Sequence, residues 1–475
     1  MRDYTKFYIG GEWIEPKGAK TLDVINPATE KPAGRISLGA ADDIDAAVKA
    51  ARAAFPAWSE TPLDERMALM SKIIDVYKSR MGDMAAAITE EMGAPAWLAE
   101  GPQAMAPLGH FMTALSAIKK FPFHEERGTS RIMKEPIGVC GFITPWNWPV
   151  NQIAAKLAPA LLTGCTIVHK PSEVAPFSAY ILAEVLHEAG VPKGVYNLVN
   201  GEGPTAGAAI ASHPGIDMVS FTGSTRAGVD VAQKAAPTVK RVHQELGGKS
   251  PNVILDDADL EKAIAGSVSA VMMNSGQSCN APTRMIAPND KMEEIVAIAA
   301  KTAEKWAPGD PASAKMGPVV SEAQWNKIQS LIEQGVKEGA TVVKGGHGKP
   351  EGLETGYYVR PTIFANVTND MTIAREEIFG PVLCIIGYDT EEEAISIAND
   401  TEYGLAGYVH SGDIERARAV ASKIRAGYIS INGAQMDFSV PFGGYKMSGN
   451  GREFGDHAFD EFLELKSVVG YAPAA

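Results

Sequence analysis

A thiol at the end of a short polar segment is the group in this chain that most directly suggests chemistry. Cys279 follows Asn274-Ser275-Gly276-Gln277-Ser278, and small and apolar residues, 267–273, precede that segment. A cysteine at such a turn, beside polar donors, can be reached by a substrate and kept partly ionised, as a nucleophile requires. A lone cysteine is more often an inert core residue. The segment therefore predicts a nucleophile only if other residues supply matching chemistry.

Length and composition are those of a soluble globular enzyme. With 475 residues the chain is too long for one simple core, and we expect two or three domains. It is 45% hydrophobic and 21% charged, and no apolar run approaches the roughly 18 residues of a membrane span. Residues 1–6 lack the apolar core of a signal peptide, so a cytoplasmic location is expected.

Charge and cysteine usage exclude several classes of partner. The formal net charge is −13 and the acidic residues are spread along the chain, which argues against nucleic acid or an anionic membrane as a partner. The four cysteines are far apart and form no Cys-x-x-Cys pair, and no His-Glu-x-x-His occurs. Neither a disulfide framework nor a metal site is predicted.

Strand and helix signals alternate between residues 138 and 246, after strand-like residues 1–40 and a helical region from 41 to about 119. Strands are expected at 139–144, 166–170, 196–199, 218–222 and 239–246, with helices at 149–162, 177–189, 205–212 and 225–236. Repeated units of this kind imply a parallel, doubly wound sheet with a ligand crevice at the carboxyl ends of its strands.

Gly223 and Ser224 mark the expected nucleotide site, because they join strand 218–222 to the next helix and its free N–H groups can meet a pyrophosphate. The usual Gly-x-Gly-x-x-Gly fingerprint is absent. Residues 247–250, Gly-Gly-Lys-Ser, resemble the end of a P-loop, but His243 stands where that motif needs glycine.

A second α/β unit is expected from 251 to about 432. Its strands are predicted at 252–255, 283–287 and 382–386, its helices near 259–274, 290–305, 321–339 and 391–399, and a surface loop at 344–356. The tail from 459 to 469 alternates apolar and polar residues, as a strand does. An unpaired edge of that kind can pair with another subunit.

Seven motifs then appear in an order that identifies a family. They are Pro145-Trp-Asn-Trp-Pro149, Lys170-Pro-Ser-Glu173, Phe221-Thr-Gly-Ser-Thr225, Glu245-Leu-Gly-Gly-Lys-Ser-Pro251, Gly276-Gln-Ser-Cys279, Glu376-Glu-Ile-Phe-Gly-Pro-Val382 and Pro441-Phe-Gly-Gly-Tyr-Lys446. Over essentially its whole length the chain resembles the NAD(P)-dependent aldehyde dehydrogenases. The resemblance implies a Rossmann-type NAD-binding domain (1–119 and 137–246), a catalytic α/β domain (247–447), and a small β oligomerisation arm and tail (120–136 and 448–475).

The resemblance also implies a mechanism. Cys279 would attack the aldehyde carbonyl, and the oxyanion would be held by the side-chain N–H of Asn147 and the backbone N–H of Cys279. After hydride transfer to the nicotinamide, Glu245 would activate the water that hydrolyses the thioacyl-enzyme, helped if burial raises its pKa. Lys156 and Glu464 resemble the positions that relay protons from Glu245. Taken singly, Glu245, Asn147 and Lys170 could be a strand-end carboxylate, a helix cap and a solvated lysine.

The family motifs also supply the expected cofactor contacts. Lys170 and Glu173 would bind the adenosine ribose, Glu377 the nicotinamide ribose with Phe379 beside it, and Trp146 would lie near the phosphates. The remaining expected cofactor-binding residues are Thr144, Ser172, Gly203, Gly223 and Ser224. A 2′-phosphate would meet the Glu173 carboxylate, so we expect NAD as the cofactor, with NADP the less favoured alternative.

The substrate is the part that the sequence indicates least. The expected pocket residues are Trp148, Ser278, Asn280, Met436, Phe438 and Phe442, with the loop 434–442 at the mouth. This lining is largely apolar and contains no arginine, so we expect an uncharged aliphatic, terpenoid or aromatic aldehyde over a dicarboxylic semialdehyde. Asp437 leaves a cationic aminoaldehyde open as an alternative.

Three other outcomes stay open at this point. A semialdehyde dehydrogenase is one, and a CoA-acylating dehydrogenase is another, although members of that kind typically lack a glutamate at the position of Glu245. A structural protein that keeps the fold without activity is the third, and intact Cys279, Glu245 and Asn147 argue against it.

A homodimer or homotetramer is expected, joined through segments near 120–136 and 459–471. Arg284 is expected to brace the catalytic loop.

Overall fold

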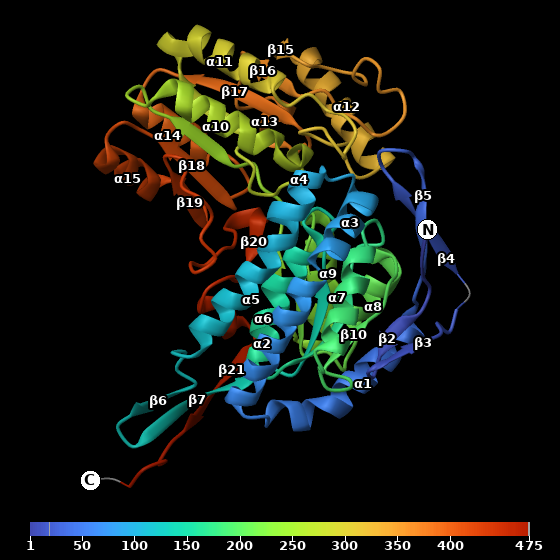
Figure 1. Ribbon diagram of the computed structural model, residues 1–475. Coiled ribbons are helices and arrows are strands. Elements are labelled where there is room, and N and C mark those ends of the chain that lie inside the picture. The colour runs from blue at the N-terminus through green and yellow to red at the C-terminus, as the bar shows by residue number, and fades with distance from the viewer. Residues whose placement is uncertain (19, 474–475) are drawn as a thin grey trace.

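The computed structural model describes residues 1–18 and 20–473. These residues form two large α/β units, one above the other in Figure 1, and an arm that projects from the lower unit. Each large unit is built on its own sheet, of eight strands in one and seven in the other, and two further sheets have three strands each. The Rossmann-type alternation expected from the sequence is confirmed in this arrangement.

The eight-stranded sheet has a parallel centre, in the order β12-β11-β8-β9-β10. Those strands are β8 (Val139–Ile143), β9 (Thr166–Lys170), β10 (Tyr196–Leu198), β11 (Met218–Thr222) and β12 (Arg241–Glu245), and the antiparallel pair β2 (Phe7–Ile9) and β3 (Glu12–Ile14) extends one edge. Nearly every residue of the central strands is buried, as expected of a parallel sheet covered on both faces.

Two separate apolar cores lie against this sheet. One is built mainly with α2 (Leu63–Ser79), α3 (Met81–Met92), α5 (Ala104–Ile118), α6 (Pro149–Thr163) and α7 (Phe177–Glu188). The other is built with α1 (Ala41–Ser59), α8 (Ala208–Ser212) and α9 (Thr225–Ala235). Short turns of α4 (Ala96–Leu98) and of π-helix at 99–103 and 203–207 complete the helical part. The helix predicted at 205–212 therefore begins as a π-turn.

The seven-stranded sheet carries the second unit, in the order β15-β16-β17-β14-β13-β18-β19. Its strands are β13 (Pro251–Ile254), β14 (Arg284–Pro288), β15 (Thr341–Lys344), β16 (Thr362–Ala365), β17 (Val382–Tyr388), β18 (Ala406–His410) and β19 (Tyr428–Ile431). Its helices are α10 (Leu260–Met272), α11 (Met292–Glu304), α12 (Glu322–Lys337), α13 (Thr372–Arg375), α14 (Glu391–Asn399) and α15 (Ile414–Lys423). The sequence predicted β13, β14, β17 and four of these helices.

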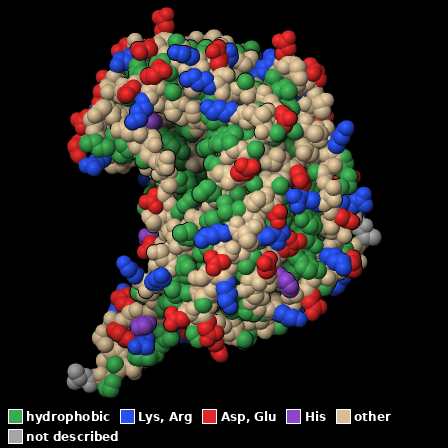
Figure 2. Space-filling model, in the orientation of Figure 1, with side chains coloured by type: hydrophobic (Ala, Val, Ile, Leu, Met, Phe, Trp, Pro, Cys, Tyr) green, Lys and Arg blue, Asp and Glu red, His purple; other side chains and the backbone are tan. Residues whose placement is uncertain are grey.

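The arm combines segments that are far apart in the chain. It consists of β6 (His124–Arg127), β7 (Ser130–Pro136) and β21 (Leu463–Val468), in the order β21-β7-β6. The strand expected from 459 begins later, because α16 (His457–Glu461) precedes it. Leu465 and Val469 are 70% and 82% exposed, and the arm stands clear of the body in Figure 2. The third sheet, β1 (Arg2–Tyr4), β5 (Lys31–Ser37) and β4 (Thr21–Asn26), lies along the opposite side (Figure 1).

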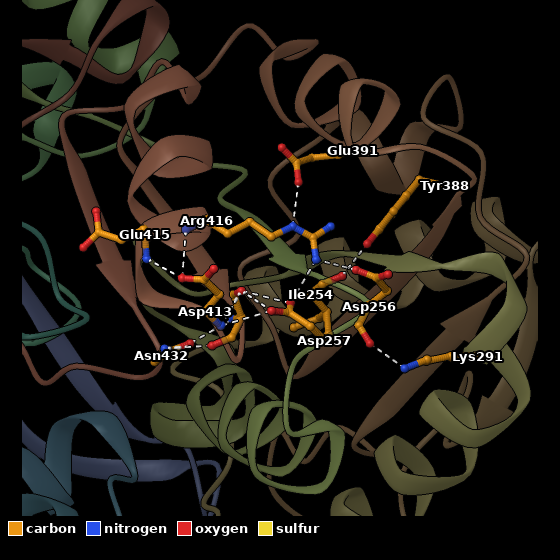
Figure 3. A network of polar contacts seen from close by, with 11 residues as sticks. Ile254, Asp256, Asp257, Lys291, Tyr388, Glu391, Asp413, Glu415, Arg416 and Asn432 are labelled. Carbon is orange, nitrogen blue, oxygen red and sulfur yellow. Dashed lines mark hydrogen bonds and ion pairs between the residues drawn. The ribbon is translucent and has the colours of Figure 1, made fainter.

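One arginine joins several elements at the carboxyl ends of β13 and β18. Arg416 on α15 contacts Asp256 at 2.6 Å, Asp257 at 3.2 Å and Glu391 of α14 at 2.8 Å (Figure 3). The Asp413 side chain caps the start of α15 and accepts from the Glu415 amide at 2.8 Å. This cluster joins α14 and α15 to the edge of the sheet that lies away from the cysteine. In the described part of the chain, no helix has both the length and the apolar character needed to cross a membrane.

Candidate active site

Residues from both large sheets meet around Cys279. Asn147 follows β8, Gly223 follows β11 and Gly247 follows β12, whereas Cys279 precedes β14 and Glu377 precedes β17. All five line one cavity of about 190 Å³. The carboxyl ends of the parallel strands of one sheet therefore face the segments that enter the other sheet, at the place where open α/β folds bind ligands.

The loop that carries the cysteine is held in an uncommon conformation. Asn274, Ser275 and Gly276 have φ angles of 54°, 55° and 74°, so three successive residues are left-handed directly after α10. A Cβ at Gly276 would lie 1.9 Å from the carbonyl oxygen of Gly380, so only glycine fits there. The turn ends the helical path and leaves Cys279 partly exposed, whereas the other three cysteines are buried.

Asn147 is joined to that loop by hydrogen bonds in both directions. Its side-chain nitrogen donates to the carbonyl oxygen of Gln277 at 3.0 Å, and its own carbonyl accepts from the Asn274 side chain at 2.8 Å. A primary amide carries two N–H groups, so one of them is available for a ligand oxygen beside Cys279. Asn147 is thus held against the loop that carries Cys279, and both residues line the same cavity.

Carboxylates dominate the electrostatics around the thiol. Burial raises the pKa of Cys279 above its usual range, and the carboxylates of Glu377, Glu245 and Glu453 raise it further. Burial also raises the pKa of Glu245 well above that of an ordinary glutamate. Glu453 adds to that shift, and Lys156 and Arg452 oppose it. Ionising either group requires nearby positive charge or a partner that takes its proton.

The buried partner of Lys156 is Glu453. The two form an ion pair in which the side chains are 0% and 4% exposed, and both lie in the surroundings of Glu245. Glu464, which the sequence suggested as a relay, lies on β21 in the arm, where its side chain is 58% exposed and contacts Arg241 at 2.9 Å. The structure therefore does not bring Glu464 to Glu245. Glu453, which the sequence analysis missed, lies in the surroundings of Glu245 instead, paired with Lys156.

The expected nicotinamide-side residues come together in the same cavity. Trp146 and Phe379 pack edge to face, with ring centroids 5.4 Å apart. The Glu377 carboxylate accepts from the backbone N–H of Gly248 at 2.9 Å. Gln324 and Lys327 of α12 also line the cavity and bind the carbonyls of Phe379 and Glu377 at 2.8 and 2.7 Å. These two were not anticipated, because they belong to no motif and lie on one face of a long helix.

Gly223 and Ser224 stand at the start of α9, as expected. The Ser224 side chain accepts from the backbone N–H of Ala227 at 3.3 Å and so caps the helix. The remaining free N–H groups at this end carry the positive end of the helix dipole. The site therefore fits a phosphate-bearing cofactor.

The expected adenosine-side residues divide into two sets. Lys170 Nζ contacts Glu173 Oε2 at 2.8 Å, and the backbone N–H of Gly203 also reaches that carboxylate. Burial raises the pKa of Glu173, but Lys170 together with the backbone N–H groups of Glu173 and Gly203 lowers it by more, so the pKa of Glu173 lies below its usual range. The side chains of the second set are engaged elsewhere. The Thr144 hydroxyl pairs with His169 at 2.9 Å, and Ser172 accepts from the Val174 amide at 3.2 Å.

An aromatic cluster lies on the other side of Cys279. Phe442 and Phe454 stack with centroids 5.1 Å apart, and Tyr428, Phe438 and Cys279 pack against the same group. Trp148 donates from Nε1 to the Ser278 hydroxyl at 2.9 Å, which fixes the ring beside the residue that precedes Cys279.

Two of the expected pocket residues, Asn280 and Met436, are not part of this aromatic cluster. The Asn280 carbonyl accepts from Tyr408 at 2.7 Å, and Met436 is 38% exposed on its loop.

His110 of α5 packs on Phe438 and Phe454, with ring centroids 4.4 and 4.6 Å away. Tyr428, Phe454 and His110 were not predicted, because no motif contains them.

Comparisons with known proteins agree with this geometry. A model of the aldehyde dehydrogenase family matches residues 13–468. A 3-succinoylsemialdehyde-pyridine dehydrogenase from a Pseudomonas species is 58% identical over 99% of both chains.

Solved structures are also similar. Aldehyde dehydrogenase C of Pseudomonas syringae, a mutant form in complex with NAD+ and octanal, is 51% identical with a TM-score of 0.98, over 99% of this chain and 98% of that one. A Mycobacterium tuberculosis aldehyde dehydrogenase complexed with NAD+ is 43% identical with a TM-score of 0.96, over 98% of both chains.

Proposed function

This chain belongs to the aldehyde dehydrogenase family, and we propose that it oxidises an aldehyde to a carboxylic acid with NAD, through a thioester on Cys279. The observation that carries the proposal is the meeting of Cys279, Asn147 and the cavity at the start of α9. Solved relatives bound to NAD+ support the choice of cofactor.

The chain's own residues divide the reaction into two halves. In the first, the Cys279 thiol releases its proton to solvent and the thiolate sulfur attacks the aldehyde carbon. The oxygen that gains charge is held by the Asn147 side chain and the Cys279 backbone N–H. When bound, NAD supplies the acceptor for the hydride that leaves the same carbon, and its positive nicotinamide ring offsets the carboxylates that keep the thiol protonated. In the second half, Glu245 takes a proton from the water that attacks the thioester carbon.

Lys156 and Glu453 provide a route for that proton. They lie in the surroundings of Glu245 and form a buried ion pair, in which the Glu453 carboxylate can accept a proton that leaves Glu245 and the Lys156 ammonium stabilises the carboxylate. This pairing replaces the relay through Glu464, which is exposed on the arm.

We propose an aldehyde with an uncharged apolar or aromatic body as the substrate. The cluster of Phe438, Phe442, Phe454 and Tyr428 beside Cys279 supports this class, because it offers apolar surface. Octanal, bound to the Pseudomonas syringae relative, and the pyridine in the name of the Pseudomonas relative belong to it. The latter name also contains a semialdehyde, which keeps a semialdehyde of aromatic character within the proposal.

The assembly that we propose is a homodimer or homotetramer. The arm exposes apolar side chains and the outer edge of β21, and both are suited to pairing with a second copy. Sedimentation at micromolar concentration should give an oligomer, and a monomer would contradict this part of the proposal.

An assay of NADH formation tests the function directly. We expect turnover of octanal and of a pyridine- or phenyl-bearing aldehyde at higher kcat/KM than succinate semialdehyde. Cys279→Ala should lose turnover by about a thousandfold or more while still binding NAD. Dependence of product release on added CoA would instead favour a CoA-acylating enzyme. Appreciable turnover by Cys279→Ala would refute the proposed nucleophile.

A further inference from the structure

We propose that His243 is a positioning residue that holds the Glu245 carboxylate ready to act as a base. The inference deepens the proposed function and rests on it. His243 and Glu245 are two residues apart on β12, so their side chains project from the same face of the strand. Both are buried, with 1% and 4% of their side-chain surface exposed, and His243 Nε2 lies 3.9 Å from Glu245 Oε1.

A serine on the neighbouring strand can hold the ring hydrogen of His243 on Nε2, the nitrogen that lies nearer to Glu245. Ser220 is the register partner of His243 in the parallel pair β11–β12, and its hydroxyl lies 3.0 Å from Nδ1. A neutral imidazole has one N–H and one bare nitrogen. When the Ser220 hydroxyl donates to Nδ1, the hydrogen of the ring is on Nε2 and points toward the carboxylate. Burial, Lys156 and Arg452 lower the pKa of His243 and so keep the ring neutral.

Both facing groups lack a hydrogen-bond partner. Within the described residues, His243 Nε2 and the two carboxylate oxygens of Glu245 are buried and unsatisfied. Such groups are rare in native proteins and costly, which points to a function for them. A shift of the carboxylate by about 1 Å toward Nε2 would close the gap to hydrogen-bonding distance. The carboxylate can therefore rest on His243 and move away from it toward the acyl group.

The surrounding backbone leaves space for these two side chains. A Cβ on Gly451, whose φ is 83°, would lie 2.1 Å from His243 Cδ2. A Cβ on Gly443 would lie 2.8 Å from Glu245 Oε1. A side chain at either glycine would displace the His243–Glu245 pair. Glycine at these two positions therefore leaves the space that the imidazole and the carboxylate occupy.

The proposed contact with His243 favours the ionised form of Glu245, which the negative charges around it oppose. The charged groups that influence its ionisation are Glu453 and Glu461, which oppose it, and Lys156 and Arg452, which favour it. A donor that binds the ionised carboxylate favours ionisation and so lowers the pKa. Removing the His243 donor should therefore raise the pKa of Glu245. The pH below which deacylation fails then moves upward.

Two substitutions of His243 distinguish the contribution of Nε2, which faces Glu245, from that of Nδ1, which faces Ser220. His243→Gln places an amide N–H near the position of Nε2, whereas His243→Asn reaches only the position of Nδ1. The acyl adduct on Cys279 is formed in a single turnover with NAD and octanal, and its decay is followed by intact mass across pH. For His243→Asn we expect the acidic midpoint of the decay rate to rise by about one pH unit. For His243→Gln we expect a midpoint near wild type.

The controls distinguish this role from a structural one. The amount of NADH formed in the first turnover should stay at about one per active site in both variants, because the thioester still forms on Cys279. Ser220→Ala should shift the midpoint in the same direction by less. Identical midpoints in wild type, His243→Asn and Ser220→Ala would overturn the proposal, as would equal loss of the first turnover in the Asn and Gln variants. Unchanged adduct decay in Glu245→Gln would instead refute the base role of Glu245 itself.

Discussion

The side-chain nitrogen of Asn147 donates to the carbonyl oxygen of Gln277, two residues before Cys279, at 3.0 Å. This bond joins the segment before α6, in the unit of the eight-stranded sheet, to the left-handed loop after α10, in the unit of the seven-stranded sheet. The proposed nucleophile and the proposed oxyanion donor are therefore held in place by the same contact, and movement between the two large units would separate them.

Asn147→Ala tests that relationship. Loss of one oxyanion donor typically costs 10²–10³ in rate, so kcat/KM should fall by about that factor, and the first turnover should slow. NAD binding should change little, as a fluorescence titration can show. Gln103→Ala is the matched control, because Gln103 Nε2 donates to the backbone carbonyl of Asn147 at 3.1 Å and not to the reacting oxygen. Equal losses in the two variants would indicate a role in loop folding only.

Glu245→Gln should change stability in a pH-dependent way. The pKa of Glu245 is raised in the folded protein, so as pH rises the unfolded chain releases this proton first, and the folded state becomes less stable above about pH 4.3. A neutral amide of the same shape removes that cost. Thermal midpoints of wild type and variant should agree near pH 4.5, and the variant should be higher at pH 8. Glu392→Gln on the exposed face of α14 should show no such divergence.

Glu173 should determine the preference for NAD over NADP. Its carboxylate is ionised next to Lys170 and would repel a 2′-phosphate. Glu173→Gln should reduce the ratio of kcat/KM for NAD to that for NADP on the order of tenfold, which corresponds to about 1.4 kcal/mol. Glu202→Gln, an exposed carboxylate beside Gly203, is the control. Comparable kcat/KM for both cofactors in wild type would refute the expectation.

Arg416→Met should lower the thermal midpoint by a few degrees without changing the active site. The substitution leaves Asp256, Asp257 and Glu391 close together with no cation between them (Figure 3). Arg418→Met, on the same helix, removes an exposed arginine paired only with Glu415, and such surface pairs contribute little. Equal midpoints in the two variants would show that the cluster is not stabilising.

Contiguous motifs made much of this site predictable. Each motif lies next to a strand or helix end, so residues such as Gly223, which follows β11, and Glu377, which precedes β17, could be placed from local sequence and chain order. The same reasoning gave the central strands of both sheets, because parallel strands are continuous apolar runs. It missed β15, β16, β18 and β19, each of which is only four or five residues long.

Residues that reach the site through tertiary packing could not be found in this way. Glu453 and Glu464 are both glutamates near the end of the chain, and only the fold shows that one lies on an inward loop and the other on an exposed strand. Phe454 and His110 join the aromatic cluster from a loop and a helix that no motif marks. Side-chain contacts over long sequence separations decide these positions.

The short strand β20 (Gly449–Asn450) lies beside β12 and pairs with Gln244 and Glu245. The residues directly after it include Glu453 and Phe454, which complete the wall around Glu245 and the aromatic cluster. A ribosome makes these residues long after Cys279 has been synthesised. A nascent chain that stops before residue 449 would carry the thiol and its base without this wall. Catalytic competence therefore arrives late in synthesis.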